Sequence, residues 1–172
     1  MRKISRENDY WQIAWIMLLI WGYFKFVYYV KNVSYPATFI FIVFLIQFAL
    51  TILFFHIFTS FSSKESSLKS FTFTMVYSLF PTFIWFLANS ILYLILPPPR
   101  TNSVSGITFS IVFISFSVAI LIWKIILTYL AVRFSSKLPF YRIVYAMILY
   151  LCVLSPYIIV LYKLKLFRVP FI

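Results

Sequence analysis

The sequence predicts an all-α polytopic integral membrane protein, a bundle of five transmembrane helices. Between Trp11 and Tyr162 the chain is divided into apolar stretches, and none of the three acidic residues lies inside one. Each stretch has roughly 18 residues or more, enough to cross a hydrocarbon core about 30 Å thick as a helix. The stretches are continuously apolar, whereas the strands of a membrane barrel alternate apolar and polar residues. With 64% hydrophobic and 10% charged residues, residues 1–172 are expected to form a single membrane domain.

The first stretch, residues 11–30, has two interpretations. It is rich in Trp and Tyr, as is typical of segments that reach the membrane interface, and Lys25 interrupts its apolar part. It is either a tilted span in which Lys25 snorkels toward the head groups, or a helix that lies in the interface. The span is favoured, and the alternative leaves a bundle of four transmembrane helices.

Prolines bound the next two predicted spans, residues 36–59 and 71–96. Pro36 opens the first of them, because the first helical turn does not need the amide hydrogen that proline lacks. The triple proline at 97–99 closes the second, since it cannot continue a helix. The last two predicted spans are residues 105–132 and 143–163.

Two further prolines, Pro81 and Pro156, lie inside predicted spans. Each removes a backbone hydrogen bond and is expected to kink its helix. Ser78 and Ser155 are placed to satisfy carbonyl groups that the prolines leave without a donor. The kinks are interpreted as features that shape the bundle. The alternative is a ligand cavity at the unwound turns.

Fifteen Lys and Arg residues against three acids give a net charge of +12, and the basic residues gather at the ends of the predicted spans. There they anchor to head groups and set the orientation, so the lipid bilayer rather than nucleic acid is the expected partner. With five spans, eight basic residues lie on the side of the N-terminus and five on the other side. This bias predicts a cytoplasmic N-terminus, with loops 60–70 and 133–142 on the same side. If residues 11–30 only lie on the surface, both termini are cytoplasmic.

Lys124 is a charge inside the fourth predicted span. A buried lysine without an acid must lose its proton or find carbonyl partners, and snorkelling toward the helix end is less costly. The alternative is a contact with a lipid phosphate or a protein partner. The residues expected to make lipid or partner contacts are Lys124, Arg133, Lys137 and Arg142.

The reactive side chains argue against catalysis and against a bound cofactor. His56 is the only histidine and Cys152 the only cysteine. Zinc and haem sites need several such ligands, so no metal or cofactor is expected on this chain alone. Motifs of hydrolases, metalloproteases and nucleotide-binding enzymes are missing as well, and the chain is not expected to be an enzyme.

Three short motifs are shared with a known family. They are Tyr35-Pro36 at the start of the second span, the aromatic-Ser-x-x-Pro turn Tyr77–Pro81, and a Trp-containing span followed by a basic loop and a last helix, here Trp123 through Arg142 and Ala146. Through them, residues 33–162 resemble the Yip family of polytopic membrane proteins, which interact with Rab GTPases in eukaryotes and have short bacterial relatives. The resemblance implies five helices and a non-catalytic role in membrane organisation or trafficking.

Two function classes remain from the sequence. The first is a Yip-like, non-catalytic membrane protein that acts through lipid and protein contacts. The second is a small accessory subunit, packed on the core of a transporter or respiratory assembly together with other membrane subunits. A solute transporter is disfavoured, because no carboxylate is available inside the spans for ion coupling. The bias toward Phe, Ile, Leu, Ser and Tyr is typical of AT-rich coding DNA and indicates a bacterial plasma membrane or an organellar membrane.

Overall fold

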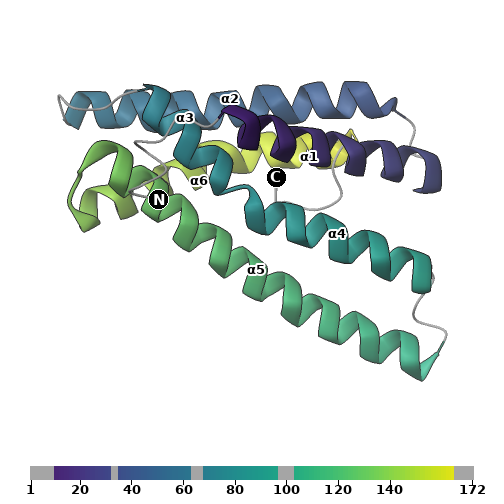
Figure 1. Ribbon diagram of the computed structural model, residues 1–172. Coiled ribbons are helices and arrows are strands. Elements are labelled where there is room, and N and C mark those ends of the chain that lie inside the picture. Colours follow the sequence, from purple (N-terminus) through teal and green to yellow (C-terminus); the bar gives the residue numbers. More distant parts are fainter. Residues whose placement is uncertain (1–9, 32–34, 63–67, 97–102, 165–172) are drawn as a thin grey trace.

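The computed structural model describes residues 10–31, 35–62, 68–96 and 103–164, and this part of the chain is an all-α bundle (Figure 1). Its helices are α1 (Tyr10–Lys31), α2 (Ala37–Ser62), α3 (Leu68–Tyr77), α4 (Phe80–Ile95), α5 (Val104–Ser136) and α6 (Phe140–Lys163). Five stretches are long and apolar enough to cross a membrane, and α3 and α4 together form the third. The predicted fold class is confirmed, and the chain is an integral membrane protein.

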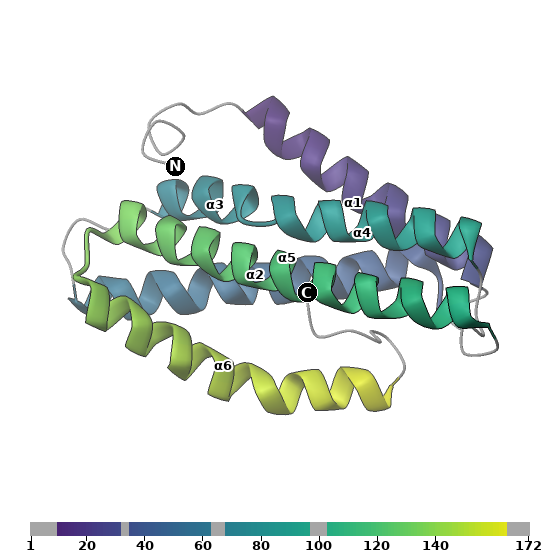
Figure 2. The same ribbon diagram turned by 90° about the horizontal axis from the view of Figure 1, so that it is seen from below.

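The helices pack in a defined order across the bundle. Helix α1 lies against α2 and α4, while α3 and α4 lie against α5. Helix α6 contacts α5 and α2 and lies on the opposite side of the bundle from α1 (Figure 2). Ile20 and Phe24 of α1 are buried in the interior. This packing supports the interpretation of residues 11–30 as a span rather than a peripheral helix.

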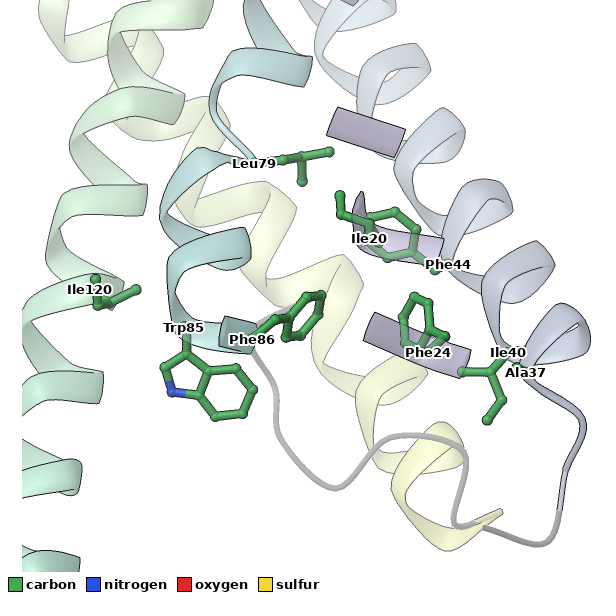
Figure 3. Packing of buried hydrophobic residues seen from close by; sticks show 9 residues of the cluster. All are labelled: Ile20, Phe24, Ala37, Ile40, Phe44, Leu79, Trp85, Phe86 and Ile120. Carbon is green, nitrogen blue, oxygen red and sulfur yellow. The ribbon is translucent and has the colours of Figure 1, made fainter. Parts of the chain in front are cut away.

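Two clusters of buried apolar side chains hold the bundle together. The first gathers residues of α1, α2, α4 and α5 around Phe24, Phe44 and Phe86 (Figure 3). The second joins α2, α3, α5 and α6 around Phe55, Phe71 and small residues such as Ala146. Aromatic rings of this size bury a large apolar area and need no polar partner, so Phe-rich helices can pack closely with very little glycine.

Polar pairs link the helices at buried positions. Thr74 of α3 and Ser135 of α5 share a hydrogen bond of 2.8 Å between their hydroxyl oxygens. The Trp85 indole N–H of α4 donates to the Ser117 hydroxyl of α5 at 2.9 Å. Such bonds fix the rotation of one helix against another, because lipid tails offer no alternative partner to the groups involved.

The third predicted span is not one continuous helix. Helix α3 ends at Tyr77 and α4 begins at Phe80, so Ser78 and Leu79 form a short turn between them. Pro81 lies in the first turn of α4, where its missing amide hydrogen is not needed. The Ser78 hydroxyl donates to the Met75 carbonyl at 2.7 Å and helps to satisfy the end of α3. The predicted kink at Pro81 is therefore a break between two helices.

The fourth predicted span is too short at its C-terminal end, because α5 continues to Ser136. Ser135 and Ser136 remain helical since both are buried, and the Ser136 hydroxyl donates to the Val132 carbonyl at 2.7 Å. Lys137 ends the helix with a left-handed backbone (φ 54°), a common C-terminal conformation. Pro139 then precedes α6. Thus the connection predicted at 133–142 is a tight turn at 137–139. The other predicted bounds lie within three residues of the observed helix ends.

Candidate functional site

A cavity of about 540 Å³ lies between α2, α5 and α6, beside the break between α3 and α4. Residues of both apolar clusters line this cavity. Phe44 and Leu79 belong to the first cluster, and Phe55 and Met75 belong to the second. The volume lies within the range of about 300–1,000 Å³ that is usual for small-molecule sites. The cavity is therefore large enough to be a ligand site rather than a packing defect.

Part of the cavity wall is formed by exposed apolar residues of α5 and α6. Ile125 of α5 and Ile148 and Leu151 of α6 belong to its wall and are also 46%, 56% and 57% exposed at the surface of the bundle. These side chains belong to α5 and α6, and Figure 2 shows α6 diverging from the rest of the bundle.

Hydrogen bonds organise one side of the cavity. The Thr51 hydroxyl of α2 donates to the Gln47 carbonyl at 2.9 Å and lies 2.6 Å from the Tyr150 hydroxyl of α6. A threonine hydroxyl has a single hydrogen, so Tyr150 is the donor of the bond to Thr51. Across the cavity, the Thr128 hydroxyl donates to the Lys124 carbonyl at 2.9 Å. All four residues belong to the cavity wall.

Lys124 is half-buried and is, among the residues that the structure describes, the one charged residue that lines the cavity. It lies about 18 Å from the C-terminal end of α5, at about 1.5 Å per residue, and Tyr150 lies about 15 Å from the start of α6. These depths place the polar side of the cavity near the middle of a hydrocarbon core about 30 Å thick. An ionisable residue at this depth marks a candidate functional site.

The other three basic residues predicted to make contacts lie apart from the cavity. Arg133, Lys137 and Arg142 are all exposed around the turn between α5 and α6. The Arg133 guanidinium donates to the Tyr129 hydroxyl at 3.2 Å. The three residues form a basic surface at one end of the bundle, and Lys124 belongs to the interior.

The two proline turns have different surroundings. Ser78, next to the break before Pro81, lines the cavity. Ser155 and Pro156 are exposed on α6, outside the cavity wall, and the Ser155 hydroxyl donates to the Leu151 carbonyl at 2.7 Å. Helix α6 continues through Pro156 to Lys163. A cavity beside an unwound turn is thus present at Ser78 and not at Ser155.

His56 and Cys152 lie apart from the polar side of the cavity. The His56 ring contacts the Phe71 ring at a centroid distance of 5.9 Å, and Cys152 is exposed on α6. Over the described ranges, no three His, Cys, Asp or Glu side chains come close enough to hold a metal ion. That this chain binds no metal or cofactor by itself stays a prediction.

Four residues of the cavity wall were not predicted as residues of a site: Gln47, Thr51, Thr128 and Tyr150. Gln47 and Thr51 are one turn apart in the part of α2, residues 39–55, that is otherwise apolar, and this spacing places both on one face. That signal is visible in the sequence. The pairing with Tyr150 is not, because it joins positions 99 residues apart.

Comparisons of this chain with models of protein families, with curated proteins and with solved structures find no match. The resemblance to the Yip family, drawn from the motifs around Pro36, Pro81 and Trp123, stays a prediction.

Proposed function

We propose that this chain is a non-catalytic membrane protein of Yip-like type, which acts through lipid and protein contacts in membrane organisation or trafficking. The observation that carries the proposal is the cavity between α5 and α6, whose wall residues Ile125, Ile148 and Leu151 are also exposed on two apolar helices long enough to span a membrane. A chamber with such a wall suits contact with lipid. It does not suit a reaction on a water-soluble substrate.

The basic surface supports the same proposal. Arg133, Lys137 and Arg142 are exposed close to the junction of α5 and α6. Exposed basic residues at a span end attract anionic head groups, by about 1 kcal/mol for each residue near the surface. The same charges also suit an acidic segment of a protein partner. Both kinds of contact require only binding, in keeping with a non-catalytic role.

One observation favours the second candidate, an accessory subunit of a larger membrane complex. The first half of α5 presents a continuous apolar face that packs on little else in this chain, with Ile107, Ile111, Ile114 and Val118 all 47% exposed or more. Such a face suits either lipid or the helices of another subunit. The two candidates therefore differ in what covers α5.

Purification of the tagged chain in a mild detergent separates the two candidates. A Yip-like protein is expected to retain lipid and a small set of membrane partners, whereas an accessory subunit is expected to bring a stoichiometric set of large subunits. Ile114→Trp on α5 and Ile159→Trp on α6 form a matched pair of exposed positions. Loss of large subunits only in Ile114→Trp would identify α5 as the docking face and would select the accessory-subunit role. A chain that retains neither lipid nor partner would contradict the proposed function.

A further inference from the structure

We infer that the cavity binds a neutral, membrane-soluble molecule with an apolar body and a hydroxyl group, and that this hydroxyl donates a hydrogen bond to the hydroxyl oxygen of Thr128. A long-chain alcohol has the required chemistry. The inference deepens the proposed function and rests on it, because it names the kind of lipid that the cavity accepts.

The wall of the cavity selects the apolar body. It is lined mainly by apolar side chains, with Phe48 from α2, Leu121 from α5 and Leu154 from α6 among them. Its volume of about 540 Å³ suits a single ligand of moderate size. A ligand that consists mostly of hydrocarbon can fill this space without leaving polar groups of its own unpaired.

Hydroxyl groups of the wall select a hydrogen-bond donor. The hydrogens of Thr51, Ser78 and Thr128 are each donated to a backbone carbonyl three or four residues earlier in the chain. A hydroxyl oxygen whose hydrogen is used in this way still has a lone pair that can accept a hydrogen bond. These three groups therefore match a ligand that donates a hydrogen bond, and they offer nothing to a ligand that only accepts one.

Thr128 is the acceptor that such a ligand can best reach. Thr51 already accepts the bond from Tyr150 at 2.6 Å, and Ser78 is only 4% exposed. Thr128 is half-buried, and in the described part of the chain its hydroxyl makes one hydrogen bond, as donor to the Lys124 carbonyl. It lies within the span 104–136, where no water competes for the hydroxyl of the ligand.

Lys124 does not require an anionic ligand. It belongs to the wall of the cavity but already interacts within the chain. A neutral hydroxyl enters the span without the cost of bringing a further charge into the hydrocarbon core. The hydrogen-bond acceptor at Thr128, one helical turn beyond Lys124, therefore determines the head group.

Photo-crosslinking of the full chain in phosphatidylcholine vesicles tests the inference. Three diazirine probes with the same alkyl chain are compared: a fatty alcohol, its methyl ether and an alkyl sulfonate. The ether keeps the oxygen but lacks the donated hydrogen, and the sulfonate is an anion that only accepts. One neutral hydrogen bond changes affinity by a factor of about 2 to 10.

We expect the alcohol to label α5 and α6 residues of the cavity wall about 2 to 10 times more than either other probe does. Ile111, which is 59% exposed on α5 and lies outside the wall, gives the reference for a probe that is only dissolved in the bilayer. Labelling there should be similar for the alcohol and the ether.

Matched variants connect this preference to the proposed site. Thr128→Val keeps the shape of the side chain and should abolish the preference for the alcohol over the ether. Thr108→Val is its control, because the Thr108 hydroxyl donates to the Val104 carbonyl of the same helix at 3.0 Å but lies outside the cavity wall. Leu154→Trp fills the cavity and should block labelling of the wall by all three probes, whereas Ile159→Trp, exposed on α6, should not.

Each other outcome counts against a stated claim. Equal labelling of the wall by alcohol and ether, or an alcohol preference that survives Thr128→Val, would overturn the assignment of the hydroxyl. Stronger labelling by the sulfonate would overturn the neutral ligand. Labelling of the wall that persists in folded Leu154→Trp would overturn the cavity as the site.

The test stays decisive if Thr128→Val fails to fold, because the comparison of probes on the unchanged chain and the Leu154→Trp variant do not depend on it. Failure of the proposed function has a different sign, namely a purified chain that retains neither lipid nor partner. A chain that retains either one but shows no labelling of the cavity wall would contradict the inference alone.

Discussion

The phenolic oxygen of Tyr150 lies 2.6 Å from the hydroxyl oxygen of Thr51, and this hydrogen bond joins α6 to α2 at the wall of the cavity. Helix α6 buries Ile143 and Ala146 near its start and Leu161 near its end. The bond between Tyr150 and Thr51 therefore ties the middle of α6 to α2, between these buried positions.

Tyr150→Phe removes this bond and keeps the ring. Hydrogen bonds between membrane helices contribute about 0.6 kcal/mol on average and up to about 1.7 kcal/mol. We expect a loss of unfolding free energy in this range, measured by denaturant titration in mixed micelles. Tyr145→Phe is the control, because Tyr145 is exposed and its ring lies beside Phe58 at a centroid distance of 6.3 Å. Equal stability of the two variants would show that the bond does not hold α6.

Thr74 and Thr72 offer a matched pair on α3. The Thr74 hydroxyl is buried 2.8 Å from that of Ser135, whereas the Thr72 hydroxyl donates to the Leu68 carbonyl of its own helix. Thr74→Val leaves the Ser135 hydroxyl without this partner, and an unsatisfied buried group costs about 1 to 3 kcal/mol. Thr72→Val should change stability by less than about 0.5 kcal/mol.

The double variant Thr74→Val with Ser135→Ala sharpens this prediction. Replacing both partners of a buried hydrogen bond is less costly than replacing one. We expect the double variant to recover part of the stability that Thr74→Val loses in the same unfolding titration. A double variant with the sum of the two single losses would contradict the pairing of Thr74 with Ser135.

The spans could be predicted from the sequence because their apolar length alone requires them to cross the membrane. Pro81 signalled a disturbance of the third span, but the sequence could not distinguish a kink from a break. That outcome depends on the separate packing of α3 and α4 against α5. Lys124 was identified as a candidate contact residue by its charge alone. The cavity around it could not be predicted, since its wall combines α2, α5 and α6 through contacts between distant residues.

The structure places the end of α2, the start of α3, the end of α5 and the start of α6 at one end of the bundle (Figure 1). Leu68 and Tyr141 are exposed at this end, and Val104 is exposed at the start of α5 at the other end. Single cysteines at these positions in a Cys152→Ser background test the orientation. We expect Leu68→Cys and Tyr141→Cys to be labelled from the cytoplasmic side and Val104→Cys from the opposite side.

The labelling has two informative failures. Modification of Leu68→Cys and Tyr141→Cys from opposite sides would contradict the arrangement of the helices. Modification of both from the outside would preserve the arrangement and reverse the orientation inferred from the basic residues.

Pro81 and Pro156 are expected to differ when each is replaced by alanine. Pro81 is buried in the first turn of α4, beside the cavity residues Ser78 and Leu79. Alanine there supplies the missing amide and favours one continuous helix. The bonds from α3 and α4 to α5 oppose a large rearrangement, so we expect a small change in stability but a displaced cavity wall. Pro156 is exposed on a helix that is already continuous, and its replacement should leave the cavity unchanged.

Serine variants make the same contrast without changing the backbone. Ser78 lines the cavity and its hydroxyl donates to the Met75 carbonyl at the end of α3, so Ser78→Ala should displace the cavity wall as Pro81→Ala does. Ser155→Ala should behave like Pro156→Ala, because Ser155 is exposed outside the cavity wall. Probe labelling, partner co-purification and thermal stability are measured for all four variants. Unchanged labelling in Pro81→Ala would show that the break does not shape the cavity. Partner loss in Pro156→Ala with intact labelling would instead place a protein contact on the exposed face of α6.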